Sequence, residues 1–207
     1  MNEAFYELPK EKQRRILNAG FEVFSQNEYK RASTEEIAAR GGISKGLLFY
    51  YFHNKKTFYL YLFEKAMTIV AEGVVNERYK SITDFFELCE YATMRKLQML
   101  KKLPYLMDFL IRAFYSQREE VSDELNSQMM QLTAPPFTDY LKNIDRSKFK
   151  ENTDPEELVQ MLSWMGDGYL HESRRKGNQV DVEGFMSHYR KWAAVVRRAV
   201  YREEYNQ

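Results

Sequence analysis

The chain has 207 residues, of which 44% are hydrophobic and 15% aromatic. This length is sufficient for one or two domains, and the apolar content supports a sizeable core, so the composition excludes an intrinsically disordered chain. The formal net charge is only +1. It is unevenly spread: residues 1–56 carry ten basic and seven acidic side chains, a balance of +3 against −2 for the remainder. That asymmetry is small, but its sign suits contact with phosphates.

Cysteine content and hydropathy bear on the compartment. Cys89 is the only cysteine, so no intrachain disulfide can form. We interpret it as a small buried apolar side chain, with redox sensing as the alternative. The N-terminus lacks a basic segment followed by an apolar one, and no apolar run approaches the roughly 18 residues that a membrane span needs. We therefore expect a cytoplasmic protein without a membrane partner.

Helical patterns cover almost the whole chain, since glycine totals nine and proline five and nothing alternates polar and apolar for long. The expected helices cover about residues 9–27, two short helices within 33–52, 55–75, 81–103, 105–116, 121–144 (interrupted at Pro135-Pro136), 155–177 and 182–205. Asn54 and Asp154 stand at N-cap positions of two of them. A polar loop is expected over 145–153.

Residues 33–52 read as two short helices joined by a tight turn. The pair Gly41-Gly42 can take positive φ at little steric cost, and Ser44 suits the N-cap of the second helix. On that helix Leu48 and Phe52 lie one turn apart and are expected to point inward. The opposite side then carries Gly46 and Tyr50, flanked by Leu47 and Phe49, with Lys45 and Tyr51 at the edges.

Such a face is unusual for a solvated helix, which normally carries Glu, Lys and Gln. A helix that enters a DNA groove gains from glycine, which permits close approach, and from lysine and tyrosine, which bond phosphates. Two helices joined by a short glycine-containing turn form the helix-turn-helix pattern. The alternative is an aromatic core helix that merely supports another domain.

The segment from residue 85 to 165 is rich in methionine and phenylalanine. This composition is typical of an ordinary core, but also of adaptable ligand cavities. The pocket candidates are Met67, Phe86, Phe109, Arg112, Met129, Met130, Trp164 and Met165. Arg112 has a second interpretation, because Asp108 lies four residues earlier and can pair with it on one helix face.

No catalytic constellation is evident. His53, His171 and His188 lack the spacing of metal ligands, and the sequence contains no P-loop, nucleophile elbow or dinucleotide-binding glycine motif. We therefore expect neither an enzyme nor a cofactor or metal site. A helical enzyme with dispersed catalytic residues and a partner module that has lost DNA binding stay open as alternatives.

A set of residues spread over about 10–70 resembles the DNA-binding domain of TetR-family (tetracycline-repressor-like) transcriptional regulators. The matching residues are Arg15-Ile16-Leu17, Ala19, Phe24, Thr34, Ile37-Ala38, Gly42 to Gly46, Leu48, Tyr50-Tyr51-Phe52 and Asn54-Lys55. The resemblance implies an all-α fold of about nine helices. It also implies a three-helix DNA-binding domain over 10–70, with the motif at about 33–52, and a helical ligand-binding and dimerisation domain over 71–207.

The resemblance also implies roles for single residues. Thr34 would cap the first motif helix and bond a phosphate; Ser44, Lys45 and Gly46 would lie at base edges or phosphates. Tyr50 and Tyr51 would touch backbone and bases, and Lys55 would hold another phosphate. Two positions depart from the family pattern, because Leu47 replaces a small polar residue and Phe49 replaces a tyrosine. Leu47 offers only apolar contact, for example to a thymine methyl, so the departures bear on which operator is bound.

The resemblance further implies that the last two helices of each subunit form a four-helix bundle in a homodimer. The candidate interface residues are Leu158, Met161, Leu162, Trp164, Tyr169, Phe185, Tyr189, Trp192 and Val196. Alternatively, these stripes are used up in the intrachain core. The expected function is a repressor that binds a palindromic operator in double-stranded DNA and is released by an apolar or cationic small molecule. A constitutive regulator without such a switch is the alternative.

Overall fold

The computed structural model describes residues 2–115, 121, 141–176 and 181–206. The chain divides into two compact units, which we describe separately. Unit 1 comprises Met1–Glu72 and Met99–Ala134, and unit 2 comprises Gly73–Gln98 and Pro135–Gln207. The expected functional division near residue 70 stays a prediction.

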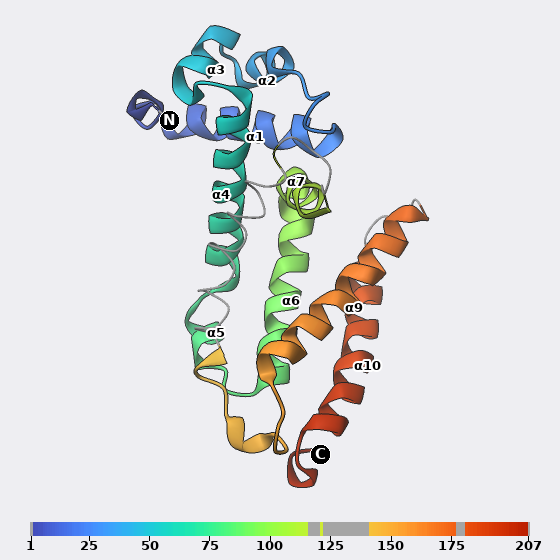
Figure 1. The fold of residues 1–207 in the computed structure, drawn as a ribbon. Coiled ribbons are helices and arrows are strands. Elements are labelled where there is room, and N and C mark those ends of the chain that lie inside the picture. Colours follow the sequence, from blue (N-terminus) through green and yellow to red (C-terminus); the bar gives the residue numbers. More distant parts are fainter. Residues whose placement is uncertain (1, 116–120, 122–140, 177–180, 207) are drawn as a thin grey trace. The chain divides into compact units, whose positions relative to one another are not determined.

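The described residues form α-helices and short 3₁₀ helices but no β-strand, so the all-α prediction is confirmed (Figure 1). Among them no helix combines the length and apolar character that a membrane span requires. The elements are η1 (Glu3–Phe5), α1 (Lys10–Gln26), α2 (Thr34–Gly41), α3 (Lys45–Phe52), α4 (Lys55–Val74), α5 (Glu77–Ser81), α6 (Phe85–Lys102), α7 (Pro104–Tyr115), η2 (Arg146–Lys148), α9 (Pro155–Arg175), α10 (Val182–Val200) and η3 (Glu203–Tyr205).

Most expected boundaries agree with the structure to within a few residues, but two do not. The helix expected over 81–103 begins only at Phe85, because Asp84 accepts hydrogen bonds from the first amides of α6 and the short α5 ends at Ser81. The last helix ends at Val200 rather than at 205. Most of the helix expected over 121–144, including its two prolines, lies outside the described residues.

Aromatic rings dominate the core of unit 1. Phe109 of α7 is fully buried, and its ring centroid lies 5.5 Å from that of Phe21 in α1 and 5.0 Å from that of Tyr59 in α4. Met67 is half-buried against the same core. Arg112 donates from Nε to the carbonyl of Ser25 at 3.0 Å. Three predicted pocket residues (Met67, Phe109 and Arg112) are therefore engaged in holding unit 1 together.

The segment before α1 belongs to the same core. Phe5 has no exposed surface, and its ring lies 4.8 Å from Phe52, 5.9 Å from Tyr51 and 6.0 Å from Tyr61 (centroid to centroid). The backbone amide of Asn2 donates to the carbonyl of Tyr51 at 2.8 Å. The chain thus folds back onto the last turn of α3 before α1 begins.

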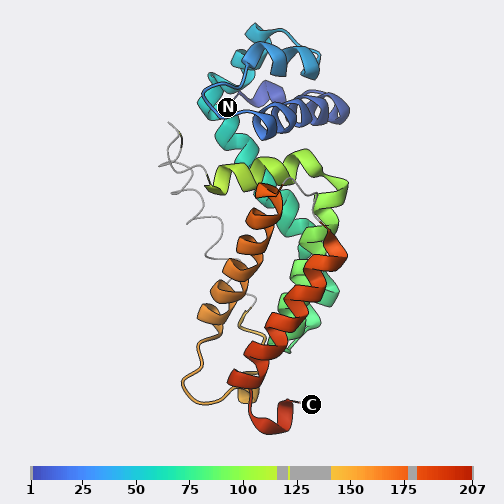
Figure 2. The same ribbon diagram turned by 90° about the vertical axis from the view of Figure 1, so that its right-hand side faces the viewer.

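In unit 2, helices α9 and α10 lie side by side (Figures 1 and 2). Gly166 permits their close approach, since a Cβ there would lie 3.2 Å from Cζ of Phe185. More than half of the predicted interface residues are buried within the chain, each at most 9% exposed. They are Leu158, Leu162, Phe185, Tyr189 and Val196.

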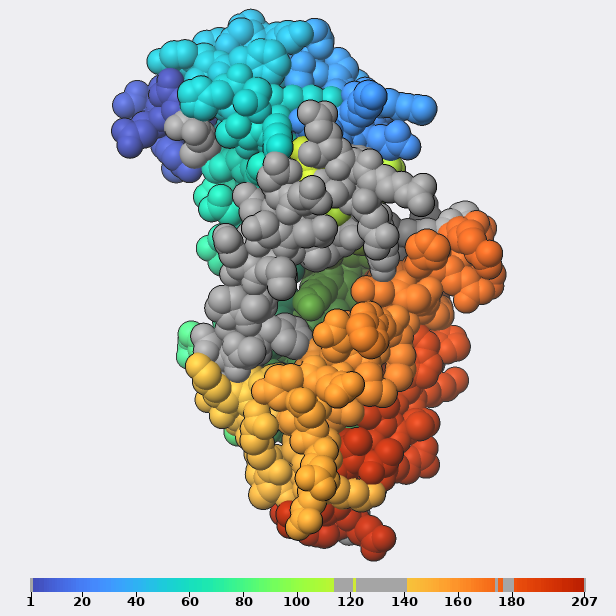
Figure 3. Space-filling view, viewed as in Figure 1, coloured from blue at the N-terminus to red at the C-terminus, as the bar shows by residue number. Residues whose placement is uncertain are grey.

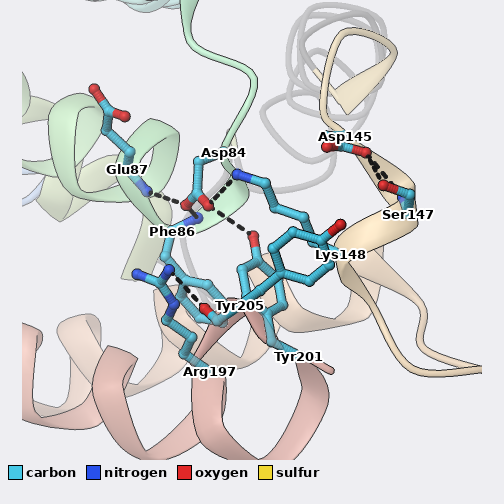
Figure 4. A network of polar contacts seen from close by, with 9 residues as sticks. All are labelled: Asp84, Phe86, Glu87, Asp145, Ser147, Lys148, Arg197, Tyr201 and Tyr205. Carbon is cyan, nitrogen blue, oxygen red and sulfur yellow. Dashed lines mark hydrogen bonds and ion pairs between the residues drawn. The ribbon is translucent and has the colours of Figure 1, made fainter. Parts of the chain in front are cut away.

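A polar network joins three distant parts of unit 2 (Figure 4). Besides capping α6, Asp84 accepts hydrogen bonds from the ammonium of Lys148 at 2.8 Å and from the hydroxyl of Tyr201 at 3.3 Å. Tyr201 is fully buried. Burial of Asp84 disfavours its ionised form, but Lys148, the amide of Glu87 and Arg197 more than offset this, so the pKa lies below its usual value.

We expect Asp84→Asn to lower the free energy of unfolding by about 2 kcal/mol near pH 7, because the amide leaves Lys148 without its carboxylate. A folded-state pKa below the unfolded value of about 3.9 means that the carboxylate stabilises the fold above that value. This contribution is lost as the pH falls through the folded-state pKa. Urea denaturation should therefore show a wild-type-to-variant difference that is full near pH 7 and shrinks below about pH 4.

Glu77→Gln is the matched control for Asp84→Asn. Glu77 also pairs with a lysine, Lys80 at 2.8 Å, but its side chain is 92% exposed. Exposed pairs contribute little, so this variant should unfold almost like the wild type. An Asp84→Asn difference that does not change with pH would contradict the proposed role of the carboxylate.

Candidate nucleic-acid interface and ligand cavity

The turn between α2 and α3 is fixed by backbone geometry and by one arginine. Gly42 has φ +67°, and the amide of Ile43 donates to the carbonyl of Ala38 at 3.0 Å, which closes α2 in a Schellman-type cap. Arg15 of α1 donates from Nε to the carbonyl of Gly41 at 2.9 Å. A Cβ on Gly42 would clash with this guanidinium. Glycine is therefore required here both for the positive φ and for the space that Arg15 occupies.

Helix α3 presents the face that its sequence predicts. Ser44 is its N-cap and accepts from the amide of Leu47 at 3.2 Å. Leu48 and Phe52 are buried, whereas Tyr50 is 56% and Leu47 40% exposed. Large exposed apolar and aromatic side chains on one short helix mark a surface suited to contact with another molecule.

The N-terminal turn of this surface carries an ion pair that sequence reasoning missed. Lys45 pairs with Glu35 of α2, and its ammonium also lies 5.7 Å from the ring centroid of the half-buried Phe49. The hydrogen bond from Lys45 is the main reason why the pKa of Glu35 falls to about 2. A phosphate that binds Lys45 must therefore compete with Glu35.

Two of the predicted DNA contacts have different local roles. The prediction that Thr34 caps α2 is wrong: Ser33 is the N-cap and accepts from the amide of Glu36 at 3.2 Å, while Thr34 is the first helical residue and only 8% exposed. Tyr51, at 7% exposure, packs edge-to-face against Phe5. Its burial places it in the support of α3 rather than on the exposed face.

The remaining cations near the motif are partly engaged within unit 1. Lys55 donates to the carbonyl of Lys30 at 3.3 Å and lies 4.8 Å from the ring centroid of Tyr29. Arg40 forms ion pairs with Glu22 at 2.5 Å and Glu36 at 2.6 Å. Among the predicted contact residues, Ser44, Lys45, Gly46, Leu47 and Tyr50 are the exposed ones.

The predicted pocket residues do not gather at one place. In unit 2, Phe86 is buried and lies 5.1 Å from the ring centroid of Tyr201, and Trp164 is 64% exposed. Met165 is half-buried. Met129 and Met130 lie outside the described residues.

Unit 2 nevertheless contains a cavity of about 70 Å³, and none of the predicted pocket residues in the described part of the chain lines it. Its walls combine apolar side chains with a thiol, several hydroxyls and one ammonium. The lining residues are Tyr79, Leu88, Cys89, Ala92, Thr93, Lys96, Leu141, Val159, Leu162, Ser163 and Tyr189. Figure 3 shows part of α6 (green) at depth beside α9 (orange).

The outer faces of α9 and α10 expose large apolar side chains. Trp164 is 64%, Met161 38% and Val195 61% exposed. A Cβ on Gly168 would meet nothing within 4 Å, so the backbone of α9 is open to close approach there. We refer to Met161, Trp164, Gly168 and Val195 as the outer patch. Val195 was absent from the predicted interface residues, because it lies outside the Phe185–Val196 stripe on which that prediction relied.

Comparison with known proteins agrees with this arrangement. Residues 16–62 match the sequence profile described as bacterial regulatory proteins, tetR family. No curated protein sequence matches the chain. Among solved structures, the fatty acid degradation regulator FadR from Bacillus halodurans superposes with a TM-score of 0.73 at 17% identity, covering 87% of this chain and 96% of that one.

Two further structures show the same fold. SmeT, the repressor of the Stenotrophomonas maltophilia multidrug efflux pump SmeDEF, gives a TM-score of 0.70 at 17% identity over 96% of this chain and 93% of that one. A TetR family regulator from Chloroflexus aurantiacus gives 0.62 at 21% identity over 98% and 99%. The predicted resemblance is confirmed: residues 16–62, within α1 to α4, match the tetR family profile, and the fold of the chain is similar to that of these regulators.

Proposed function

We propose that this chain is a homodimeric transcription regulator of the cytoplasm that binds a palindromic operator through α3 and is released from it by a small molecule. The observation that carries the proposal is the exposed face of α3. Lys45, Gly46, Leu47 and Tyr50 face solvent there, while Leu48 and Phe52 anchor the helix in the core. A helix held from one side and polar or aromatic on the other suits the major groove.

A homodimer is proposed because two copies of a recognition helix are needed to read a palindrome. The outer patch supports this part of the proposal, since a 64% exposed tryptophan is costly in water and is typical of interface hot spots. The packing of α9 on α10 within one chain leaves the patch uncovered.

The cavity in unit 2 and the fold support the proposal that repression responds to a ligand. SmeT is a repressor of a multidrug efflux pump, and FadR from Bacillus subtilis has been crystallised with stearoyl-CoA (TM-score 0.65, 19% identity, 87% of this chain and 96% of that one). By linkage, an effector that weakens operator binding must itself bind less tightly to the DNA complex. A coupling of about 1–3 kcal/mol corresponds to roughly 5- to 150-fold in operator affinity.

The Lys45–Glu35 pair gives the first test on DNA. We expect Glu35→Gln to strengthen operator binding about two- to fivefold, because it frees Lys45 and removes a negative charge that opposes the phosphates. Lys45→Met should weaken binding and lower the slope of log affinity against log salt by about one. Fluorescence anisotropy over a salt titration measures both. Glu172→Gln in α9, which removes an equivalent exposed carboxylate, should change neither value.

The ring of Phe49 gives a second test. Phe49→Tyr is expected to strengthen operator binding by about 0.5–1.5 kcal/mol, the net worth of one added hydrogen bond to a phosphate. The reciprocal variant Tyr50→Phe removes a hydroxyl from an exposed ring and should weaken binding by a similar amount. Thermal unfolding of both variants should match the wild type. Weaker binding by Phe49→Tyr would place that ring away from the DNA backbone.

The outer patch gives the test of the dimer. Truncating an interface tryptophan commonly costs at least about 2 kcal/mol, so Trp164→Ala should raise the dimer dissociation constant roughly 30-fold or more. Sedimentation equilibrium measures this directly. Tyr105→Ala, which removes an aromatic ring that is 44% exposed in unit 1, is the control and should leave the dissociation constant unchanged. A Trp164→Ala protein that assembles like the wild type would remove the outer patch from the interface.

A further inference from the structure

An ammonium group lines the cavity of unit 2 and has no partner among the residues that the structure describes. Lys96 lines the cavity, and it forms no hydrogen bond or ion pair with any other residue that the structure describes. The residue is exposed, so the cavity is open to solvent at Lys96, and desolvation by the neighbouring protein atoms lowers the pKa of its ammonium. A cation that is partly desolvated beside an apolar cavity gains from pairing with an anion, so this position favours an anion that enters from solution.

Among the described residues, Asp167 and Cys89 are the groups whose charge acts on Lys96, and neither forms an ion pair with it. Asp167 of α9 acts on Lys96 only through space, and the pKa of Asp167 is raised by its own burial despite the lysine. The Cys89 thiol shares the cavity, but burial raises its pKa to about 12, so it is neutral. A carboxylate brought by a ligand would therefore meet the ammonium of Lys96 and a neutral thiol, with Asp167 acting on the site only through space.

The other walls fit a short hydrocarbon with one polar end. Leu88, Ala92, Val159 and Leu162 supply apolar surface, and Ser163 adds a hydroxyl with no hydrogen bond to any described residue. At roughly 10–15 Å³ for each water-sized group, the cavity of about 70 Å³ accommodates a ligand of the size of a short-chain carboxylate.

We propose that this cavity binds a short-chain carboxylate whose anionic group pairs with Lys96 and Ser163 and whose hydrocarbon chain packs on the apolar wall of α6 and α9. The inference rests on the proposed ligand-responsive function, for which it names the effector class. It replaces the cationic effector that the sequence suggested, because the charged side chain that lines the cavity, Lys96, is positive. The apolar part of that expectation is retained.

The experiment measures binding of three ligands with four-carbon chains and different polar ends to the full-length protein without DNA. Isothermal titration calorimetry with butyrate, butyramide and butylamine separates the effect of charge from that of the hydrocarbon. Butyrate should bind more tightly than either of the others. Lys96→Met should weaken butyrate binding about 10- to 100-fold, the worth of one hydrogen bond to a charged group, and Lys96→Arg should restore part of it.

Two further variants keep the result interpretable. Lys101→Met removes an exposed lysine from the same helix outside the cavity, so it should bind butyrate like the wild type. Asp167→Asn should tighten butyrate binding, since it removes a negative charge that acts on the same lysine. If the wild type binds butylamine and Asp167→Asn does not, the proposal is overturned in favour of a cationic effector.

Two further results would overturn the inference. One is equal affinity of the wild type and Lys96→Met for butyrate. The other is no binding of butyrate up to about 10 mM, a concentration that would detect dissociation constants in the millimolar range. Operator binding is measured separately by fluorescence anisotropy with and without butyrate. Carboxylate binding that depends on Lys96 supports the inference whether or not the chain binds DNA, so failure of the two proposals can be told apart.

Discussion

At Gly20, helix α1 lies so close to α4 that one added methyl carbon would stand 2.6 Å from Cδ1 of Leu62 and 2.8 Å from the ring of Phe58. Carbon atoms attract one another best at about 3.5–4.0 Å, so only glycine allows this approach. Helix α4 begins directly after α3, and Arg15 ties the end of α2 to α1. This close contact holds α1 against α4, and Arg15 and the short connection between α3 and α4 tie the exposed face of α3 to the same pair of helices.

Local signals were enough to predict the helix-turn-helix and most helix ends. Ser44, Asn54 and Asp154 accept hydrogen bonds from amides two or three residues ahead, as their positions in the sequence indicated. Positive φ at Gly42 and the burial of Leu48 also follow from a few neighbouring residues. Such features depend on interactions within one turn of the chain, which a single sequence contains in full.

Interactions between distant residues could not be predicted in this way. Asp84, Lys148 and Tyr201 meet although more than fifty residues separate each from the next. The prediction of the pocket residues was wrong for the same reason. The apolar character of a side chain does not indicate whether it packs in the core of unit 1 or of unit 2. Phe109 is in the core of unit 1, whereas Lys96, a charged residue on a helix, lines the cavity of unit 2.

The burial of Phe5 has a consequence for how the helix-turn-helix part of the protein can be isolated. A fragment designed from the sequence resemblance over residues 10–70 would begin near Lys10 and would lack this ring. Its removal would open a hole among Phe52, Tyr51 and Tyr61, the residues that hold the last turn of α3. Loss of a buried phenylalanine commonly costs about 3–5 kcal/mol. A minimal fragment should therefore retain the residues before α1, and an affinity tag is better placed at the other end.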